Sequence, residues 1–202
     1  MIDHTTLLSK LSLHGIDTSW FSAYLQNHTQ SVSLTDNRGV TTTFKPLPNN
    51  IGVFQGSALG PLLYCVFAND LSLFAEEAVV VQYADDTQIL VSGKRHEILN
   101  VAREMEQVLA SLDIWFRANG LKVNAAKTQL MLLGSAQNMR TVSLSDITVK
   151  FRDHDLQPVS ETKNLGVIFD RTLNWDAHVS TVFVFNSKWV SFLQTMRLRE
   201  LL

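Results

Sequence analysis

The chain has 202 residues, 46% hydrophobic and 18% charged, a composition typical of a globular protein with a core of its own. Its net charge of −2 argues against a free-standing nucleic-acid-binding domain, which usually carries a basic excess. The single cysteine, Cys65, excludes an internal disulfide and a cysteine-based zinc site, and its apolar surroundings predict a buried side chain. Without a signal sequence or an apolar run of about 20 residues, we expect a soluble intracellular protein of the nucleus or cytoplasm, with no membrane contact.

Apolar periodicity and turn-forming residues predict the elements of the first half. In chain order these are a helix over residues 5–14, a helix over 18–27, a hairpin of strands 30–34 and 41–44, and a helix over 59–74. Gly15 is a typical stop after the first helix. Pro61 falls in the first turn of the last one, where its missing N–H costs little.

The second half continues with strands and one long amphipathic helix. The predicted elements are strands 78–83 and 87–92, a helix from Ile98 to Asn119-Gly120, strands 121–124, 127–133 and 165–169, and a terminal helix over 175–202. Helices and strands alternate without a strict βαβ repeat. The sequence therefore predicts the α+β class.

Adjacent carboxylates at the turn of the apolar hairpin 78–92 are the sharpest chemical feature. Asp85 and Asp86 repel each other there and gain nothing from packing. A hard divalent cation such as Mg²⁺ prefers carboxylate oxygens and would offset the repulsion. Taken alone, the pair is more typical of a solvated turn than of a metal site, because aspartate forms turns through its own hydrogen bonds.

The surrounding motifs give the pair a context. Tyr83-Ala84-Asp85-Asp86 between two strands resembles the catalytic hairpin of reverse transcriptases. Three further segments resemble motifs of the non-LTR, LINE-like retrotransposon group in the same order: GVFQGSALGPLL at 52–63 with NDL at 69–71, NGLKVN at 119–124 with Lys127-Thr128, and KNLGVIFD at 163–170. The ordered series is far more specific than any single motif.

This resemblance implies a fold, an activity and partners. The fold is a polymerase palm, with residues 1–170 as an N-terminally truncated reverse transcriptase domain and residues 171–202 as the start of a thumb or connection helix. The activity is RNA-directed DNA polymerisation by two-metal nucleotidyl transfer, using Mg²⁺ or Mn²⁺. The partners are an RNA template, a DNA primer and deoxynucleoside triphosphates.

The resemblance also implies roles for two aspartates and one lysine. Asp85 is expected to be the direct metal ligand, and Asp86 a less direct member of the pair. Lys127 is a candidate general acid for the pyrophosphate leaving group, although a solvated surface lysine fits the sequence as well. Tyr83 is expected to pack beneath the hairpin.

The segment Gln55-Gly56-Ser57 is expected to contact the nucleotide and template. A glycine before a helix lets a ligand approach the backbone, and helix N–H groups favour phosphate. The ordinary alternative for these residues is a serine-capped helix start.

The resemblance does not include every residue that the reaction requires. The family's other catalytic aspartate precedes a segment like Ile2-Asp3-His4, so Asp3 is expected at a helix entrance and without a catalytic role. We therefore expect the isolated chain to be inactive, with a catalytically silent remnant or a repurposed RNA- or protein-binding module as the alternative. Gln55-Gly56-Ser57 and Ala84 disfavour an RNA-dependent RNA polymerase.

Overall fold

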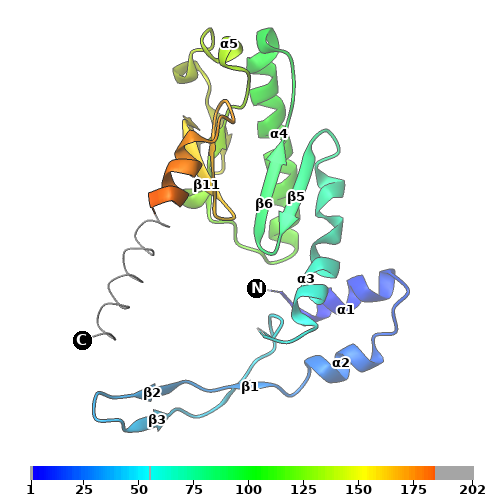
Figure 1. Ribbon diagram of the computed structural model, residues 1–202. Helices are drawn as coiled ribbons and strands as arrows, with labels where there is room; N and C mark the ends of the chain where they lie inside the picture. The colour runs from blue at the N-terminus through cyan, green and yellow to red at the C-terminus, as the bar shows by residue number, and fades with distance from the viewer. Residues whose placement is uncertain (1, 55, 185–202) are drawn as a thin grey trace, which may run out of the picture. The chain divides into compact units, whose positions relative to one another are not determined.

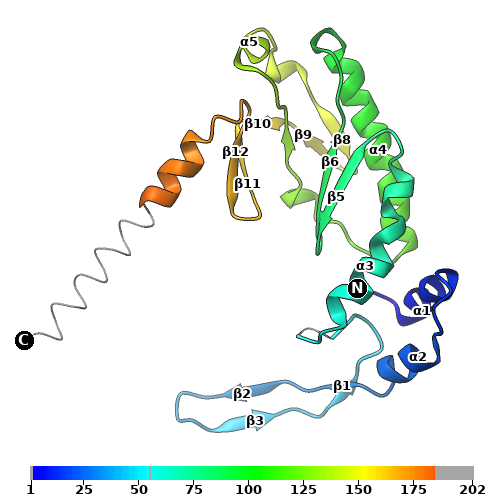
Figure 2. The ribbon, with the colours of Figure 1, turned by 45° about the vertical axis from the view of Figure 1, so that its right-hand side comes forward.

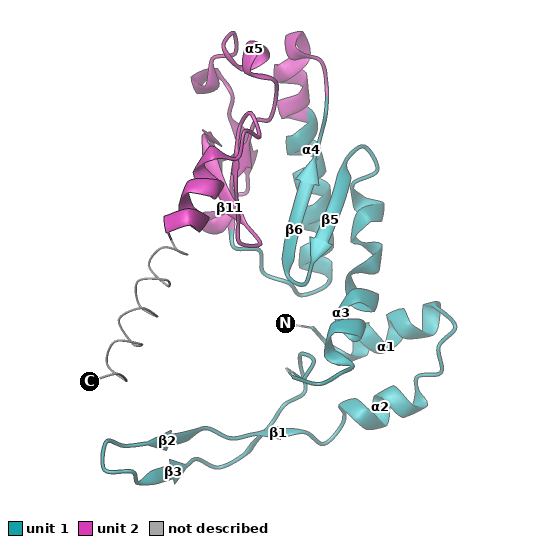
Figure 3. Ribbon diagram, viewed as in Figure 1, with its two compact units in different colours: residues 1–92, 104–124 teal, residues 93–103, 125–202 magenta. Residues whose placement is uncertain are grey.

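The computed structural model describes residues 2–54 and 56–184 (Figure 1). The chain divides into two compact units (Figure 3). Unit 1 comprises residues 1–92 and 104–124, and unit 2 comprises residues 93–103 and 125–202. Both units combine helices with strands, in agreement with the predicted α+β class.

Unit 1 contains the first three predicted helices, most of the fourth, and both predicted hairpins. Its elements are α1 (His4–Leu13), α2 (Ser19–Leu25), β1 (Thr29–Gln30), β2 (Ser33–Thr35), β3 (Thr41–Thr43), β4 (Leu47–Pro48), α3 (Gly60–Ala68), the 3₁₀ helix η1 (Asn69–Phe74), β5 (Val79–Tyr83), β6 (Asp86–Leu90) and most of α4 (Ile98–Ala118). Its buried side chains come mainly from α1, α3, η1 and α4, and include Leu7, Leu11, Leu63, Phe67, Leu71, Leu112 and Trp115. The hydrophobic core of unit 1 is therefore helical.

The predicted hairpin over 30–44 is confirmed and is longer than expected. Antiparallel β1–β4 and β2–β3 pairs build a two-stranded arm, residues 28–49, that extends away from the helices in two views (Figures 1 and 2). Hydroxyl pairs Ser33–Thr43 and Thr35–Thr41, 2.8 and 2.9 Å apart, bridge its strands. Nearly every side chain of the arm is exposed.

A polar network ties three helices of unit 1 together. The Lys10 Nζ donates to the Asp70 carboxylate and to the Phe67 carbonyl oxygen, both at 2.7 Å. The Trp115 indole N–H donates to the same Asp70 oxygen at 3.0 Å. We call this the Lys10–Asp70–Trp115 network. The helix predicted over 59–74 changes from α to 3₁₀ geometry at Asn69, where the Lys10 ammonium binds the Phe67 carbonyl.

Helix α4 ends at the predicted glycine. Gly120 has φ +66°, the Leu121 N–H donates to the Phe116 carbonyl, and the Gly120 N–H donates to the Arg117 carbonyl. These bonds form a Schellman motif, which satisfies the last helical carbonyls. Buried Asn119 adds a side-chain bond to the Trp115 carbonyl.

Unit 2 consists of short elements around a small core of Ile147, Val149 and Phe151. Besides the start of α4 it contains η2 (Arg95–Glu97), η3 (Ala125–Lys127), β7 (Leu130–Met131), α5 (Ala136–Met139), η4 (Leu144–Asp146), β8 (Val149–Phe151), β9 (His154–Leu156), β10 (Pro158–Val159), β11 (Glu161–Asn164), β12 (Val167–Asp170) and a helix over 176–184. β8–β9 and β11–β12 are antiparallel hairpins, and β7 pairs with β10 in parallel.

Several predicted strands are wrong in extent. Residues 121–124 form no strand, and 127–133 contain only β7, because η3 occupies the start of that stretch. The strand expected over 165–169 begins at Val167, because Leu165 and Gly166, with φ +47° and +86°, make a tight turn. The terminal helix starts after Trp175, and its predicted residues 185–202 lie outside the described part of the chain.

The loop after β12 is organised by one carboxylate. The Asp170 side chain accepts hydrogen bonds from the Thr172, Asn174 and Trp175 backbone N–H groups and from the Thr172 hydroxyl. Desolvation alone would raise the pKa of Asp170, but these hydrogen bonds lower the pKa to about 2. The last residue of the segment 163–170 therefore fixes the turn into the final helix.

Two expectations from composition have definite outcomes. The Cys65 side chain is exposed, so the prediction of a buried cysteine is wrong, because its position on α3 faces away from the core. No helix among the described residues is long and apolar enough to cross a bilayer.

Candidate active site

The β5–β6 hairpin places the two aspartates in different backbone positions. Tyr83 pairs with Asp86 and Val79 with Leu90, which leaves Ala84 and Asp85 as a two-residue turn. Asp85 therefore lies at the tip, whereas Asp86 is the first residue of β6. Both side chains are exposed. This asymmetry is compatible with unequal roles for the two acids.

One face of the hairpin is apolar and open. Paired residues of antiparallel strands share a face, so Asp86 lies on the side of Tyr83, Val81 and Val79. Those three side chains are 66%, 52% and 59% exposed. Tyr83 does not pack beneath the hairpin, and that prediction is wrong, because the pairing register directs it to the open face.

The turn residue Ala84 carries backbone strain. Its φ of +51° lies in the left-handed region, which costs a residue with a Cβ roughly 1–2 kcal/mol. Ala84→Gly is therefore expected to stabilise the hairpin by about 0.5 kcal/mol, after the greater chain entropy of glycine is subtracted. Urea unfolding of the two proteins measures the difference. An equal or lower stability of the glycine variant would show that the turn is not strained in solution.

Tyr64 on α3 is a site residue that the sequence did not reveal. Its side chain is half-buried, and burial raises the pKa of its phenol, followed in size by the negative charge of Asp85. The negative charge of the Asp85 carboxylate at the hairpin tip therefore disfavours ionisation of the Tyr64 phenol. Residues 64 and 85 belong to different elements, and no periodicity links them, so no pattern in the sequence could have paired them.

The segment Gln55-Gly56-Ser57 forms the approach to α3. Gln55 lies outside the described residues. Gly56 has φ +81° and the Ser57 N–H donates to the Phe54 carbonyl at 3.2 Å, as in a turn that needs glycine at its third position. The Ser57 hydroxyl donates to the Phe54 carbonyl and accepts the Gly60 N–H, so it also serves as a local helix cap.

The N-terminal residues hold this segment in place. The Gly52 N–H donates to the Ile2 carbonyl at 2.6 Å, and the His4 Nε2 donates to the Gly52 carbonyl at 2.8 Å. Asp3 caps α1 through a 2.9 Å bond from the Thr6 N–H, which also lowers the pKa of its carboxyl. Asp3 is therefore engaged at a helix entrance, as predicted.

The remaining predicted site residue belongs to the other unit. Lys127 ends η3 in unit 2 and is exposed, whereas Asp85 and Asp86 belong to unit 1. Its assignment as a general acid remains a prediction.

The carboxylate oxygens of the hairpin are the type of ligand that a hard cation such as Mg²⁺ prefers. Mg²⁺ is commonly bound by one or two carboxylates together with waters and substrate phosphates, and the hairpin offers two accessible carboxylates. Over residues 2–54 and 56–184, no group of three or more His, Cys, Asp or Glu side chains is arranged to hold a metal ion. Further oxygen ligands would have to come from substrate, water or additional polypeptide.

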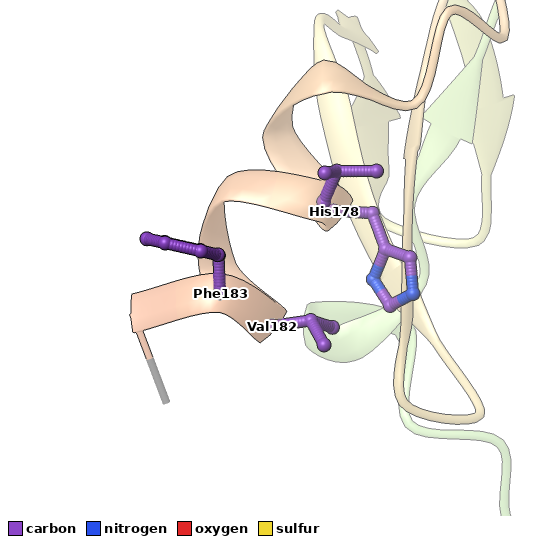
Figure 4. Close-up of a pocket in the computed structure, with 4 residues that line it drawn as sticks. His178, Val182 and Phe183 are labelled. Atoms are coloured by element: carbon purple, nitrogen blue, oxygen red, sulfur yellow. The ribbon is translucent and has the colours of Figure 1, made fainter. Parts of the chain in front are cut away.

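A shallow hollow on the helix over 176–184 has no comparable chemistry. It is lined by His178, Val179, Val182 and Phe183 (Figure 4). The His178 Nδ1 accepts a 3.4 Å hydrogen bond from the Ile168 N–H, which ties the helix to β12. The other three lining side chains are apolar, so His178 is the one group in this lining that could act as an acid or base, and its Nδ1 already accepts the Ile168 N–H.

Comparison with known proteins agrees with the motifs. The sequence family described as "Reverse transcriptase (RNA-dependent DNA polymerase)" matches residues 1–169. An RNA-directed DNA polymerase from mobile element jockey of Drosophila melanogaster is 28% identical over 170 residues, which cover 79% of this chain and 17% of that protein. A probable RNA-directed DNA polymerase from transposon BS of the same species is 32% identical over 135 residues, covering 63% of this chain and 14% of the relative. The chain thus spans less than a fifth of these relatives, and no solved structure gives a significant match.

Proposed function

Because this chain belongs to the reverse transcriptase (RNA-dependent DNA polymerase) family, with relatives among retrotransposons of the non-LTR type, we propose that it is part of an RNA-directed DNA polymerase. The observation that carries the proposal is the hairpin tip, where Asp85 lies in a two-residue turn, Asp86 follows it, and both side chains are exposed. In this proposal the hairpin belongs to a polymerase palm within residues 1–170, and residues 171–202 begin a thumb or connection helix.

Asp85 and Asp86 would hold Mg²⁺, with Asp85 as the direct ligand. When bound, the metal positions the attacking and leaving oxygens of nucleotidyl transfer and offsets their charge. The chain's own contribution is to present two carboxylates at the end of a short antiparallel hairpin. Tyr64 adds a half-buried phenol within the field of Asp85.

The other proposed roles concern substrate contacts. Gln55-Gly56-Ser57 would contact the template and the incoming deoxynucleotide. The Gly56 backbone and the α3 N-terminus offer N–H groups of the kind that bind phosphate. Lys127 would protonate the pyrophosphate as it leaves. The substrates are an RNA template, a DNA primer and deoxynucleoside triphosphates.

A second candidate is a binding module without catalysis. It is favoured by the donor set, because within the described residues the hairpin brings two carboxylates together and no third acid joins them. A remnant of this kind would keep its RNA or protein contacts without extending a primer.

Primer extension tests the proposed polymerase. The longest open reading frame that contains this chain is expressed from its transcript and given a DNA primer on an RNA template, Mg²⁺ and either deoxy- or ribonucleoside triphosphates. We expect incorporation of deoxynucleotides. Preferential incorporation of ribonucleotides would overturn the assignment, and absence of extension together with retained RNA binding would favour the binding module.

A further inference from the structure

Four aromatic rings of unit 1 form a continuous row, and of these only Phe54 belongs to a motif identified in the sequence. Trp20 and Tyr24 on α2 stack with ring centroids 5.3 Å apart and planes 8° from parallel. Tyr24 meets Phe54 edge to face at 5.4 Å, and Phe54 lies 3.8 Å from the His28 ring. We call these side chains the aromatic row.

The inner rings are packed, whereas the outer rings make local contacts, Trp20 with the Phe21 ring at 5.1 Å and His28 with the Tyr24 carbonyl at 2.8 Å, and keep much of their surface exposed. Tyr24 and Phe54 are half-buried and anchor α2 against the segment before α3. Trp20 is 57% exposed and His28 is exposed, so both ends of the row remain open to solvent. The row therefore presents ring surface outward instead of closing into the helical core.

Phe54, one of the two inner rings of the row, is directly linked to the proposed substrate segment. The Phe54 carbonyl accepts both the N–H and the hydroxyl of Ser57, which closes the turn containing Gly56. A ligand that contacts Gly56 and Ser57 thus lies next to the row along the chain. Phe54 therefore contributes its ring to the row and its carbonyl to the turn that contains Gly56.

Acidic residues are sparse in the stretch that carries the row. Between Asp17 and Asn69 the acids are Asp17 and Asp36, matched by Arg38 and Lys45, so this stretch is neutral in a chain of net charge −2. The Asp17 carboxylate accepts hydrogen bonds at the start of α2, and the Asp36 carboxylate accepts backbone N–H groups at the tip of the arm. A phosphate backbone would therefore meet few negative charges here, and both are engaged by hydrogen bonds.

We propose that the aromatic row is a stacking surface for unpaired bases of the template strand as it approaches Gly56 and Ser57. Every base has a π face, so stacking on aromatic side chains is tolerant of sequence, as template handling requires. Trp20 offers the most accessible ring, and Tyr24 backs it in parallel. This proposal rests on the proposed polymerase function, because it takes the ligand to be its template.

Binding of single-stranded RNA without metal or nucleotide tests the proposal independently of catalysis. The 202-residue chain is titrated into a labelled oligo(U) of about 12 nucleotides, within the range of a stacking groove, and anisotropy is followed. Trp20→Ala is expected to weaken binding roughly 5- to 150-fold, the loss of one base–aromatic stack. Trp20→Phe should restore most of the affinity, because it returns a ring. Phe74→Ala, which removes an exposed ring of unit 1 outside the row, should leave binding unchanged.

The controls separate stacking from other causes. The same RNA annealed to its complement should bind with little dependence on Trp20, since its bases are already stacked. Absence of binding by the wild-type chain, equal effects of Trp20→Ala and Phe74→Ala, or equal losses for single and double strands would each overturn the proposal. So would a change in sedimentation on Trp20→Ala with unchanged RNA affinity, which would assign the row to a protein contact.

The outcome is distinguishable from that of the polymerase proposal. If RNA binding depends on Trp20 but the protein extends no primer, the stacking surface is supported and the polymerase function is contradicted. Primer extension that depends on Asp85 but is insensitive to Trp20 would do the reverse.

Discussion

Asp85→Asn is expected to reduce primer extension by roughly 10³-fold or more, because a lost metal ligand removes several kcal/mol of transition-state stabilisation. The substitution keeps the size of the side chain and leaves the β5–β6 register unchanged, since Asp85 lies in the turn. Asp86→Asn should cost less, because that residue is assigned the less direct role. The measurement is the rate of deoxynucleotide incorporation at saturating Mg²⁺ and template.

The chain offers a matched control for this experiment. The β8–β9 hairpin has the same kind of two-residue turn, with Arg152 at φ +54° followed by exposed Asp153. Asp153→Asn changes the same atoms in the same turn position and should leave extension unchanged. Extension that survives Asp85→Asn would place the chemistry elsewhere, and equal losses in both variants would point to charge or folding instead of metal binding.

Asp70→Ala is expected to lower the free energy of unfolding by about 2 kcal/mol, less than the full cost of breaking a buried ion pair because the Asp70 side chain is 39% exposed. The Lys10 side chain is only 12% exposed, and its ammonium lies 4.7 Å from the Phe67 and Trp115 ring centroids. Without Asp70 that charge loses its carboxylate, and the buried Trp115 indole loses its acceptor. Urea denaturation of the wild-type and variant chains measures the loss.

Two further variants make the stability test specific. Arg117→Ala removes an ion pair of the same 2.7 Å length, but the arginine is 71% exposed, so the cost should be about 0.5 kcal/mol or less. Lys10→Met combined with Asp70→Asn removes the stranded charge and keeps an acceptor for Trp115, so it should recover most of the loss. If Asp70→Ala costs no more than Arg117→Ala, the network does not contribute to stability.

The sequence predicted the elements whose cause is local. The apolar stripe and Asn119-Gly120 predicted α4 and its end, and turn residues between β-prone runs predicted both hairpins of unit 1. The strands of unit 2 were largely missed because they are two to four residues long, too short for an alternating pattern to be recognised. Residues 121–124 looked like a strand by composition, yet strand formation requires a partner that composition does not reveal.

For the candidate site, the sequence identified motifs but not neighbours. Asp85, Asp86, Gly56 and Ser57 could be named because their spacing resembles that of a known family. The field of Asp85 at the Tyr64 phenol, the stacking of Trp20 on Tyr24 and the contact of Lys10 with Asp70 all depend on tertiary packing. None of these pairings except Trp20 and Tyr24, which are four residues apart on one helix, leaves a periodic trace in the sequence.

The Lys10–Asp70–Trp115 network also bears on how copies of such a gene decay. Three codons spread over more than half of the chain specify groups that share one carboxylate, so changes at these positions have non-additive effects and cannot drift independently. A copy that loses Asp85 should keep its fold and lose only the proposed chemistry, whereas a copy that loses Asp70 should also lose stability. If selection on polymerisation is relaxed while the folded chain is still needed for another function, substitutions at Asp85 and Asp86 should therefore accumulate before substitutions in the network.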